Sequence, residues 1–311
     1  MKDAQVKATT SQEDFLAPIL SDSKSQASEY RARNRLFILR SVHAGDVPEY
    51  LEKGWEVQRT GKRKTSVRRT KTHDQQLEDR IWCLLYKMGY EKLNGKRFVI
   101  QFERDDGSKG RKQIDVFACD NETAFVIECK SKDVRGRRSL QKDLLESIAL
   151  QTYIRKSIYA EYGASPKPKI IWAYATHNII WSEPDVQRAN DGGISILTEN
   201  ELQYLETFVR HLGPAARYQV VGEFLKGQKV PGLGEVRLPA IRGKLGGEQF
   251  YSFVATPRVL LKIAFINHQA LNHPDGRPAY QRMISSSRVK EIEKFIQSGG
   301  YFPTNILVNF M

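Results

Sequence analysis

The sequence predicts a mixed α/β protein in which helices flank a central sheet, and three observations support this. An amphipathic segment comes first, at 74–90, and three β-rich runs separated by short turns follow it. A long helical segment, a further strand and a last helix complete the series. Helix, three strands, helix, strand, helix is the order expected of a mixed α/β core.

Each element has its own signal. The first helix carries apolar residues at helical spacing, with Asp74 as its predicted N-cap and Gly89 as its end. Turn-forming residues between the three β-rich runs predict an antiparallel meander. The expected strands are 97–103, 113–119, 124–130 and 169–176, and the later helices are 139–161 and 199–212.

The flanking segments differ in composition from this core, which we place at 73–212. Polar, aperiodic residues predict a disordered tail at 1–28, followed by a basic N-terminal segment at 29–72. Glycine and proline predict a linker at 213–237. A second, partial α/β domain is expected at 238–311, where the sequence stops on an apolar run.

The chain is strongly basic, with 49 Lys plus Arg against 36 Asp plus Glu and a net charge of +13. Such a balance favours a polyanionic partner, although a solvated lysine-rich surface explains it equally well. The tract 59–72 contains no acid and is either a solvated loop or hairpin or a nucleic-acid contact, which we favour. Its candidate contacts are Lys62, Arg63, Lys64, Arg68 and Arg69.

The sequence has no pattern that indicates a membrane segment, a secretory signal or a disulfide bond. No apolar run approaches the roughly 20 residues that span a bilayer, and the N-terminal stretch lacks the apolar core of a secretory signal. We therefore expect a cytoplasmic protein with no membrane partner. Cys83, Cys119 and Cys129 are odd in number, lack CxxC spacing and lie in apolar segments, so neither disulfides nor zinc is expected.

Charged residues interrupt two of the predicted strands. Asp115 lies in the strand 113–119, and Glu128 and Lys130 end the next strand, two positions apart and therefore on one face. If Asp115 shares that face, two carboxylates and an ammonium converge. Adjacent carboxylates repel unless a hard cation such as Mg²⁺, or Mn²⁺ in its place, binds them both. Lys130 could then activate the attacking water and stabilise charge on a phosphodiester.

These residues, with Glu78 on the preceding helix, resemble the PD-(D/E)XK nuclease superfamily over about 73–212. The resemblance implies a restriction-endonuclease-like fold, as in Mrr-like nucleases and junction resolvases. It also implies that Asp115 and Glu128 are metal ligands, Lys130 is catalytic and Glu78 is an auxiliary carboxylate. Ile114 stands where the motif has proline. The alternative for Glu78 is a solvated helix face.

Two polar residues lie on the helix predicted after the ExK tripeptide. Gln151 falls within the apolar stripe of that helix, where it either bonds a strand-end carbonyl or reaches the metal site as a catalytic residue. Arg155, one turn on, could reach a phosphate. The connection before the helix is predicted to be a basic loop beside the site. Its candidate contacts are Lys132, Arg135, Arg137 and Arg138.

The C-terminal region has a looser resemblance. The stretches LPAIRGKLGGEQFYSF, YQRMISSSRVKEIEKFI and GGYFPTNILVNF, within 238–311, are similar to the start of the DGQHR domain family. That family is known from DNA-modification and defence loci. The naming motif Asp-Gly-Gln-His-Arg does not occur in the sequence, so we expect an incomplete copy.

Together these features predict a Mg²⁺-dependent DNA endonuclease in restriction or defence against foreign, and in some cases modified, DNA. The alternative is a DNA-binding or regulatory protein whose nuclease fold does not cut. RNA as the substrate stays open. A homodimer, and partner proteins from a defence or modification locus, are compatible with either function.

Overall fold

The computed structural model describes residues 16–162, 167–225, 237–257, 259–260 and 286–301. A seven-stranded mixed sheet forms its centre, in the order β1-β5-β7-β8-β9-β10, with β6 paired to β5. Within the described residues, no helix is long and apolar enough to cross a membrane. The strands are β1 (Leu16–Leu20), β5 (Lys92–Glu103), β6 (Lys109–Gln113), β7 (Val116–Cys119), β8 (Thr123–Arg137), β9 (Lys169–Ile180) and β10 (Ile194–Leu197).

The direction of the strands changes at β8. The β5, β7 and β8 strands form the predicted antiparallel meander, whereas β9 runs parallel to β8 and β10 runs parallel to β9. The parallel pairs are connected through helices, because a parallel connection must cross the sheet. The mixed α/β fold class is therefore as the sequence predicts, with a central mixed sheet flanked by helices.

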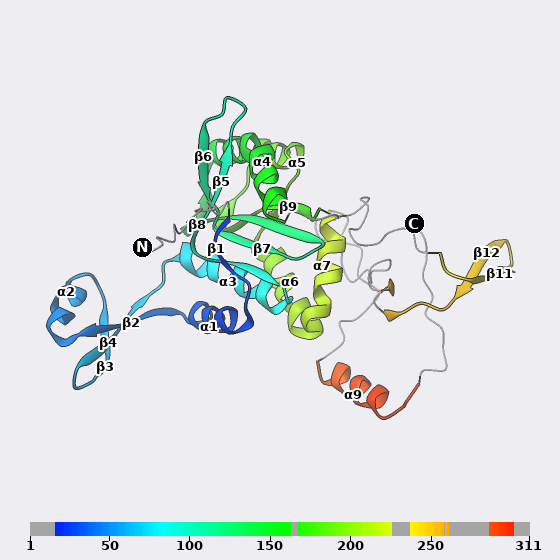
Figure 1. Ribbon diagram of the computed structural model, residues 1–311, viewed down its shortest axis with the longest axis horizontal. Helices are drawn as coiled ribbons and strands as arrows, with labels where there is room; N and C mark the ends of the chain where they lie inside the picture. Colours follow the sequence, from blue (N-terminus) through cyan, green and yellow to red (C-terminus); the bar gives the residue numbers. More distant parts are fainter. Residues whose placement is uncertain (1–15, 163–166, 226–236, 258, 261–285, 302–311) are drawn as a thin grey trace, which may run out of the picture.

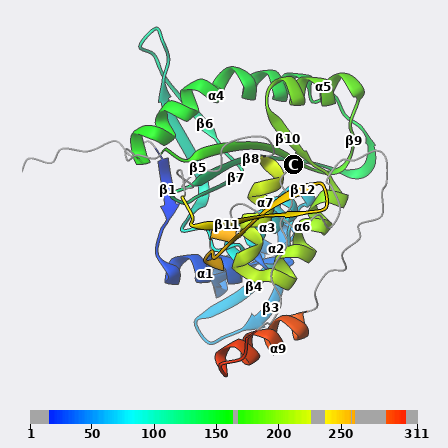
Figure 2. The ribbon, with the colours of Figure 1, turned by 90° about the vertical axis from the view of Figure 1, so that its right-hand side faces the viewer.

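Helices cover both faces of this sheet (Figure 2). One apolar core joins α3, α6 and α7 to the face that carries Ile127 and Cys129, and another joins α4 and α5 to the face that carries Val126. Alternation along β8 separates these two sets of side chains. The helices are α3 (His73–Lys87), α4 (Gln141–Tyr162), α5 (Glu183–Asp191), α6 (Glu199–Leu212) and α7 (Ala216–Phe224).

The predicted disordered tail at 1–28 is wrong for the part that the structure describes. The β1 strand pairs antiparallel with β5, and α1 (Ser23–Arg33) follows it. Asp22 caps α1 by accepting from the Ser25 backbone N–H at 2.8 Å, and the buried Gln26 donates to the carbonyls of Leu20 and Glu91. The polar composition of this segment gave no indication that Asp22 and Gln26 form these hydrogen bonds. Residues 1–15 lie outside the described part.

The basic segment contains a second, smaller sheet that extends away from the main one (Figure 1). Its three antiparallel strands pack on α2 around Val42, Trp55 and Val67. The basic tract 59–72 is mostly a hairpin of this sheet, one of the two forms that its composition allowed. The elements are β2 (Phe37–His43), the 3-10 helix η1 (Ala44–Asp46), α2 (Val47–Glu52), β3 (Glu56–Thr60) and β4 (Lys64–Thr70).

The predicted linker at 213–237 is wrong in its first half. The 3-10 helix η2 (Gly213–Ala215) leads into α7, whose residues Val220 and Val221 are buried in the main core. Phe224 meets Phe125 of β8 edge to face, with 5.4 Å between ring centroids. The short apolar stretch was hidden by the glycine-rich sequence after it. Residues 226–236 lie outside the described part.

The C-terminal region is described in two pieces. A hairpin joins β11 (Ala240–Leu245) to β12 (Glu248–Phe253), and α9 (Ser286–Gln297) comes later. Most of the sequence between them, 261–285, and the end at 302–311 lie outside the described residues. The partial domain expected at 238–311 therefore stays a prediction.

Candidate active site

Asp115 lies at a break between two strands. The sequence predicted one continuous strand over 113–119, but β6 ends at Gln113 and β7 begins at Val116. The buried Asn94 side chain spans this break, because its Nδ2 donates to the Asp115 carbonyl at 3.1 Å and its Oδ1 accepts from the Phe117 N–H at 3.0 Å. The Asp115 carboxylate accepts from the Cys129 backbone N–H at 2.8 Å. These bonds fix Asp115 against β8.

Glu128 and Lys130 lie where β8 passes from buried to exposed. Their side chains are 10% and 19% exposed, and Lys130 Nζ donates to Glu128 Oε2 at 3.1 Å. The second carboxylate oxygen, Glu128 Oε1, is buried without a hydrogen-bond partner in the described structure. Buried polar atoms are nearly always paired, so this oxygen is a candidate ligand atom.

Burial and neighbouring charges shift the pKa of all three groups. Burial, then the charge of Asp115, raises the pKa of Glu128 to about 7. Burial also raises the pKa of Asp115, against the stabilising Cys129 N–H and the charge of Lys130. Burial alone would lower the pKa of Lys130, but Glu128 and Asp115 together raise it. The group is a coupled cluster with more negative than positive charge.

Glu78 approaches the same cluster from α3, on the other face of the sheet. Burial, then the charge of Asp115, raises the pKa of Glu78 to about 7. Asp115 therefore lies within electrostatic range of both Glu78 and Glu128. The neighbouring Asp79 is different, because it is paired with Arg33 at 3.1 Å and Lys71 at 2.7 Å. Asp79 is thus neutralised by two ion pairs, whereas no ion pair of Glu78 occurs among the described residues.

Asp115 and Glu128 suit a hard divalent cation. Two buried carboxylates, one of them with an oxygen that has no hydrogen-bond partner among the described residues, form an arrangement that a bound cation would stabilise. Magnesium binds through one or two protein carboxylates and keeps several waters. Among the described residues, no three His, Cys, Asp or Glu side chains are gathered into a ready cage. The site thus offers two protein carboxylates rather than a closed ligand set.

The sequence analysis did not place three residues beside the cluster: Lys112, Asp74 and Ser131. Lys112 on β6 pairs with Glu146 at 2.8 Å, and its charge opposes the burial that raises the pKa of Asp115 and Glu128. Asp74 accepts from Ser131 Oγ at 2.6 Å. Asp74 is not the N-cap of α3, because Thr72 caps the helix in a capping box with Gln75. The sequence TxxQ was the signal for this cap.

The predicted basic loop after Lys130 is an extension of strand β8. The pairing of β8 with β9 shifts between Ser131 and Gly136, so residues 132–135 form a bulge loop opposite Asn178. Lys132 and Arg135 lie on this bulge loop, and Arg137 ends the strand. Arg138 follows it, and its Nη1 donates to the Ser131 carbonyl at 3.5 Å. Four predicted phosphate contacts therefore follow closely on Lys130.

Gln151 forms a hydrogen bond to the backbone at the end of α5. Its Nε2 donates to the Gly192 carbonyl at 2.9 Å, where α5 ends before β10. This bond to a backbone carbonyl favours a structural role for Gln151 over the catalytic role. Arg155 is exposed on α4, and among the described residues no contact joins it to the carboxylates.

The hairpin cations lie apart from the cluster on the small sheet. Lys62 and Arg63 form its exposed turn, and Lys64 begins β4. Arg68 pairs with Glu56 at 3.0 Å, and the guanidinium of Arg69 lies over the Trp55 ring at 5.2 Å. The last two residues thus have partners within their own sheet.

Comparisons with known proteins leave the family open. No protein-family model matches the sequence, and no curated protein matches it. Among solved structures, the chain is similar to protein VC1899 from Vibrio cholerae, with 14% identity and a TM-score of 0.33, over 62% of this chain and 52% of that one. It is also similar to a protein of unknown function, AF1548, with 18% identity and a TM-score of 0.30, over 46% and 81%. The chain thus spans about half of VC1899, and these low scores leave function to be argued from the residues.

Proposed function

We propose that this protein is a metal-dependent endonuclease that hydrolyses phosphodiester bonds in DNA. The observation that carries the proposal is the meeting of Asp115, Glu128 and Lys130 where β8 passes from buried to exposed, with Glu128 Oε1 buried and without a hydrogen-bond partner among the described residues. A protein gains nothing in stability from such an oxygen, because a buried polar atom without a hydrogen-bond partner is costly. A ligand that supplies positive charge removes the cost.

Each residue has a chemical role in this proposal. Asp115 and Glu128 would hold Mg²⁺ or Mn²⁺, which would supply Lewis acidity toward the phosphate. Lys130, at the partly exposed end of the cluster, neutralises charge that develops on the phosphate oxygens. Glu78, whose pKa is raised to about 7 by burial and by Asp115, is suited to accept a proton from the attacking water near neutral pH.

The choice of DNA rests on charge and on the resemblance. A net charge of +13 attracts a polyanion, and the exposed turn of the small sheet offers Lys62 and Arg63 at a distance from the cluster. A role in restriction or defence follows only from the resemblance of 73–212 and 238–311 to families found in such loci. Modified DNA therefore belongs in the test.

The test incubates modified and unmodified plasmid with Mg²⁺, Mn²⁺ or chelator. We expect nicking with either metal and none with chelator. Asp115→Asn and Lys130→Met should each lower the rate by roughly 10²-fold to 10³-fold, the scale for losing one preorganised charge. Lys156→Met, on an exposed lysine, is the matched control and should cut normally. Undiminished cutting by either site variant would refute the assignment.

A binding protein without nuclease activity is the second candidate, and one observation favours it. Lys130 already neutralises one oxygen of Glu128, and the Asp115 carboxylate already accepts from Cys129 N–H. A cluster that is partly satisfied in this way could persist without metal. Such a protein would bind DNA with strong salt dependence and would show no metal-dependent nicking in the same assay.

A further inference from the structure

A groove of about 590 Å³ opens beside the proposed active site, between the start of α3 and the bulge loop of β8. Ser131, which follows Lys130 directly, lines the groove and bonds Asp74 on its opposite side. After burial and Asp115, the charge of Asp74 is among those that raise the pKa of Glu78. The groove therefore adjoins the carboxylate cluster through Ser131 and Asp74.

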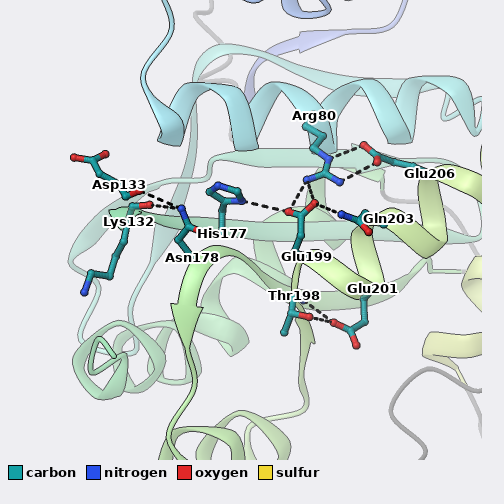
Figure 3. Close-up of polar contacts among 10 residues, drawn as sticks. All are labelled: Arg80, Lys132, Asp133, His177, Asn178, Thr198, Glu199, Glu201, Gln203 and Glu206. Carbon is teal, nitrogen blue, oxygen red and sulfur yellow. Dashed lines mark hydrogen bonds and ion pairs between the residues drawn. The ribbon is translucent and has the colours of Figure 1, made fainter. Parts of the chain in front are cut away.

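The bulge loop that forms one wall is specifically held in place. Asn178 has a φ of +58°, a left-handed conformation that few residues other than glycine adopt, and its Nδ2 donates to the carbonyls of Lys132 and Asp133 (Figure 3). Lys132 Nζ in turn donates to the Arg137 carbonyl at 3.1 Å. Bulges near functional sites re-aim side chains, and here the loop exposes Val134 to 77%.

The opposite wall contains an aromatic ring with a fixed support. His73 lines the groove, is about half exposed and stacks on His177, with 6.1 Å between ring centroids and planes 17° apart. His177 is held by Glu199 at 3.2 Å, and Glu199 is held by Arg80 (Figure 3). His73 thus lies between an anchored ring and the groove, and its Nε2 is 3.8 Å from Asp133 Oδ1 on the bulge loop, a contact that a ligand on the ring would replace.

The groove differs from a simple track for phosphates. The carboxylates of Asp74 and Asp133 lie in its lining and would repel a phosphate, but they can accept hydrogen bonds from base amino groups. Lys132 and Arg135 supply positive charge on the bulge loop. An imidazole face, an exposed valine and acceptors together suit a nucleoside, flanked by phosphates that contact the two cations.

We propose that this groove holds one unstacked nucleotide of the substrate strand, next to the scissile phosphate, with its base on the His73 ring. The volume of the groove lies within the range of pockets for single small ligands, which fits one nucleotide. A nucleotide must leave the helical stack to reach it, which is easiest at unpaired positions. The inference rests on the proposed function and adds a preference for locally unpaired DNA.

The test measures binding in chelator, where no cutting occurs, by fluorescence anisotropy. The probes are one labelled DNA sequence as a paired duplex, as a duplex with a central mismatch and as a single strand. We expect the full chain to bind the two unpaired forms about tenfold more tightly than the duplex, the scale of one base stacked on an aromatic ring. His73→Ala should abolish that ratio, whereas His73→Trp should keep it.

A second variant covers the case in which His73→Ala fails to fold. Arg135→Ala should weaken binding of all three probes, whereas Arg210→Ala, on an exposed arginine of α6, should not. Equal affinities of the unaltered chain for all probes, an unchanged ratio in His73→Ala, or equal behaviour of the two arginine variants would overturn the inference. A chain that shows the ratio but never cuts with Mg²⁺ or Mn²⁺ would refute the nuclease and retain the groove.

Discussion

The carboxylate cluster and the basic hairpin both concentrate charge, but they do so in opposite environments. The Glu128 side chain is 10% exposed, has one oxygen without a hydrogen-bond partner among the described residues, and has a pKa raised to about 7 by burial and Asp115. Lys62 and Arg63 lie on an exposed turn, where water solvates their charge. The first arrangement is costly without a ligand, and the second costs the fold almost nothing.

This difference indicates what each region can contribute. Removing a buried charge changes stability, metal affinity and pH dependence together, because its ionisation is coupled to folding. Removing an exposed cation changes mainly long-range attraction, which salt screens. The cluster should therefore dominate chemistry and the hairpin should dominate encounter with the polyanion.

The largest expected effect tests the buried side of the comparison, with Glu128→Gln. Burial and Asp115 raise the folded-state pKa of Glu128 from 4.5 to about 7, so the folded chain binds more protons than the unfolded chain between these values. Stability without metal should fall as the pH rises through this interval. Glu128→Gln should lessen that fall and raise Tm at pH 8 by roughly a few degrees. Thermal melts at pH 5 and pH 8 measure this.

Metal provides the second half of the same experiment. Mg²⁺ at about 100 times its Kd should stabilise the unaltered chain by about 2.7 kcal/mol. It should stabilise Glu128→Gln much less. Glu103→Gln, at an exposed position on β5, is the control and should respond like the unaltered chain. If the stability of Glu128→Gln and of Glu103→Gln depends on pH and metal in the same way, Glu128 is not a buried metal ligand.

A smaller effect tests the exposed side, by replacing Lys62, Arg63 and Lys64 with alanine. If all three contact phosphates, the slope of log affinity against log salt should fall by up to about 2.7, three contacts at about 0.9 each. Cleavage at saturating DNA should stay unchanged. The matched control removes three exposed cations elsewhere, Lys24, Arg31 and Arg210, for the same change in net charge. An equal loss of slope in both triples would mean that only net charge matters.

The sequence predicted what depends on local periodicity. Alternation and turn residues located the strands that flank Asp115 and the strand that carries Glu128, and helical spacing located the helix that carries Glu78. It did not predict how the chain interrupts those patterns. The break at Asp115 depends on Asn94, which is distant in sequence, and the bulge loop depends on Asn178. Neither long-range hydrogen bond leaves a periodic signal.

The small sheet shows the same limit. Val42, Trp55 and Val67 form its core, but they are separated by polar and basic residues that conceal the alternation. Similarly, Lys71 belongs by composition to the basic tract, yet it is buried and donates to the Arg33 carbonyl at 2.8 Å. Composition alone cannot distinguish a lysine that bonds another part of the protein from one that contacts a polyanion. Only the partners in space do so.

The smallest effect on activity is expected at Gln151, which the sequence allowed as a catalytic residue. Because its Nε2 donates to the Gly192 carbonyl, Gln151→Ala should lower the free energy of unfolding by about 1 kcal/mol and leave the cleavage rate unchanged. Thr152→Ala, at the exposed neighbouring position, should change neither quantity appreciably. Denaturant unfolding and the plasmid assay measure the two quantities. A large loss of cleavage with unchanged stability would place Gln151 in the reaction and extend the cluster across α4.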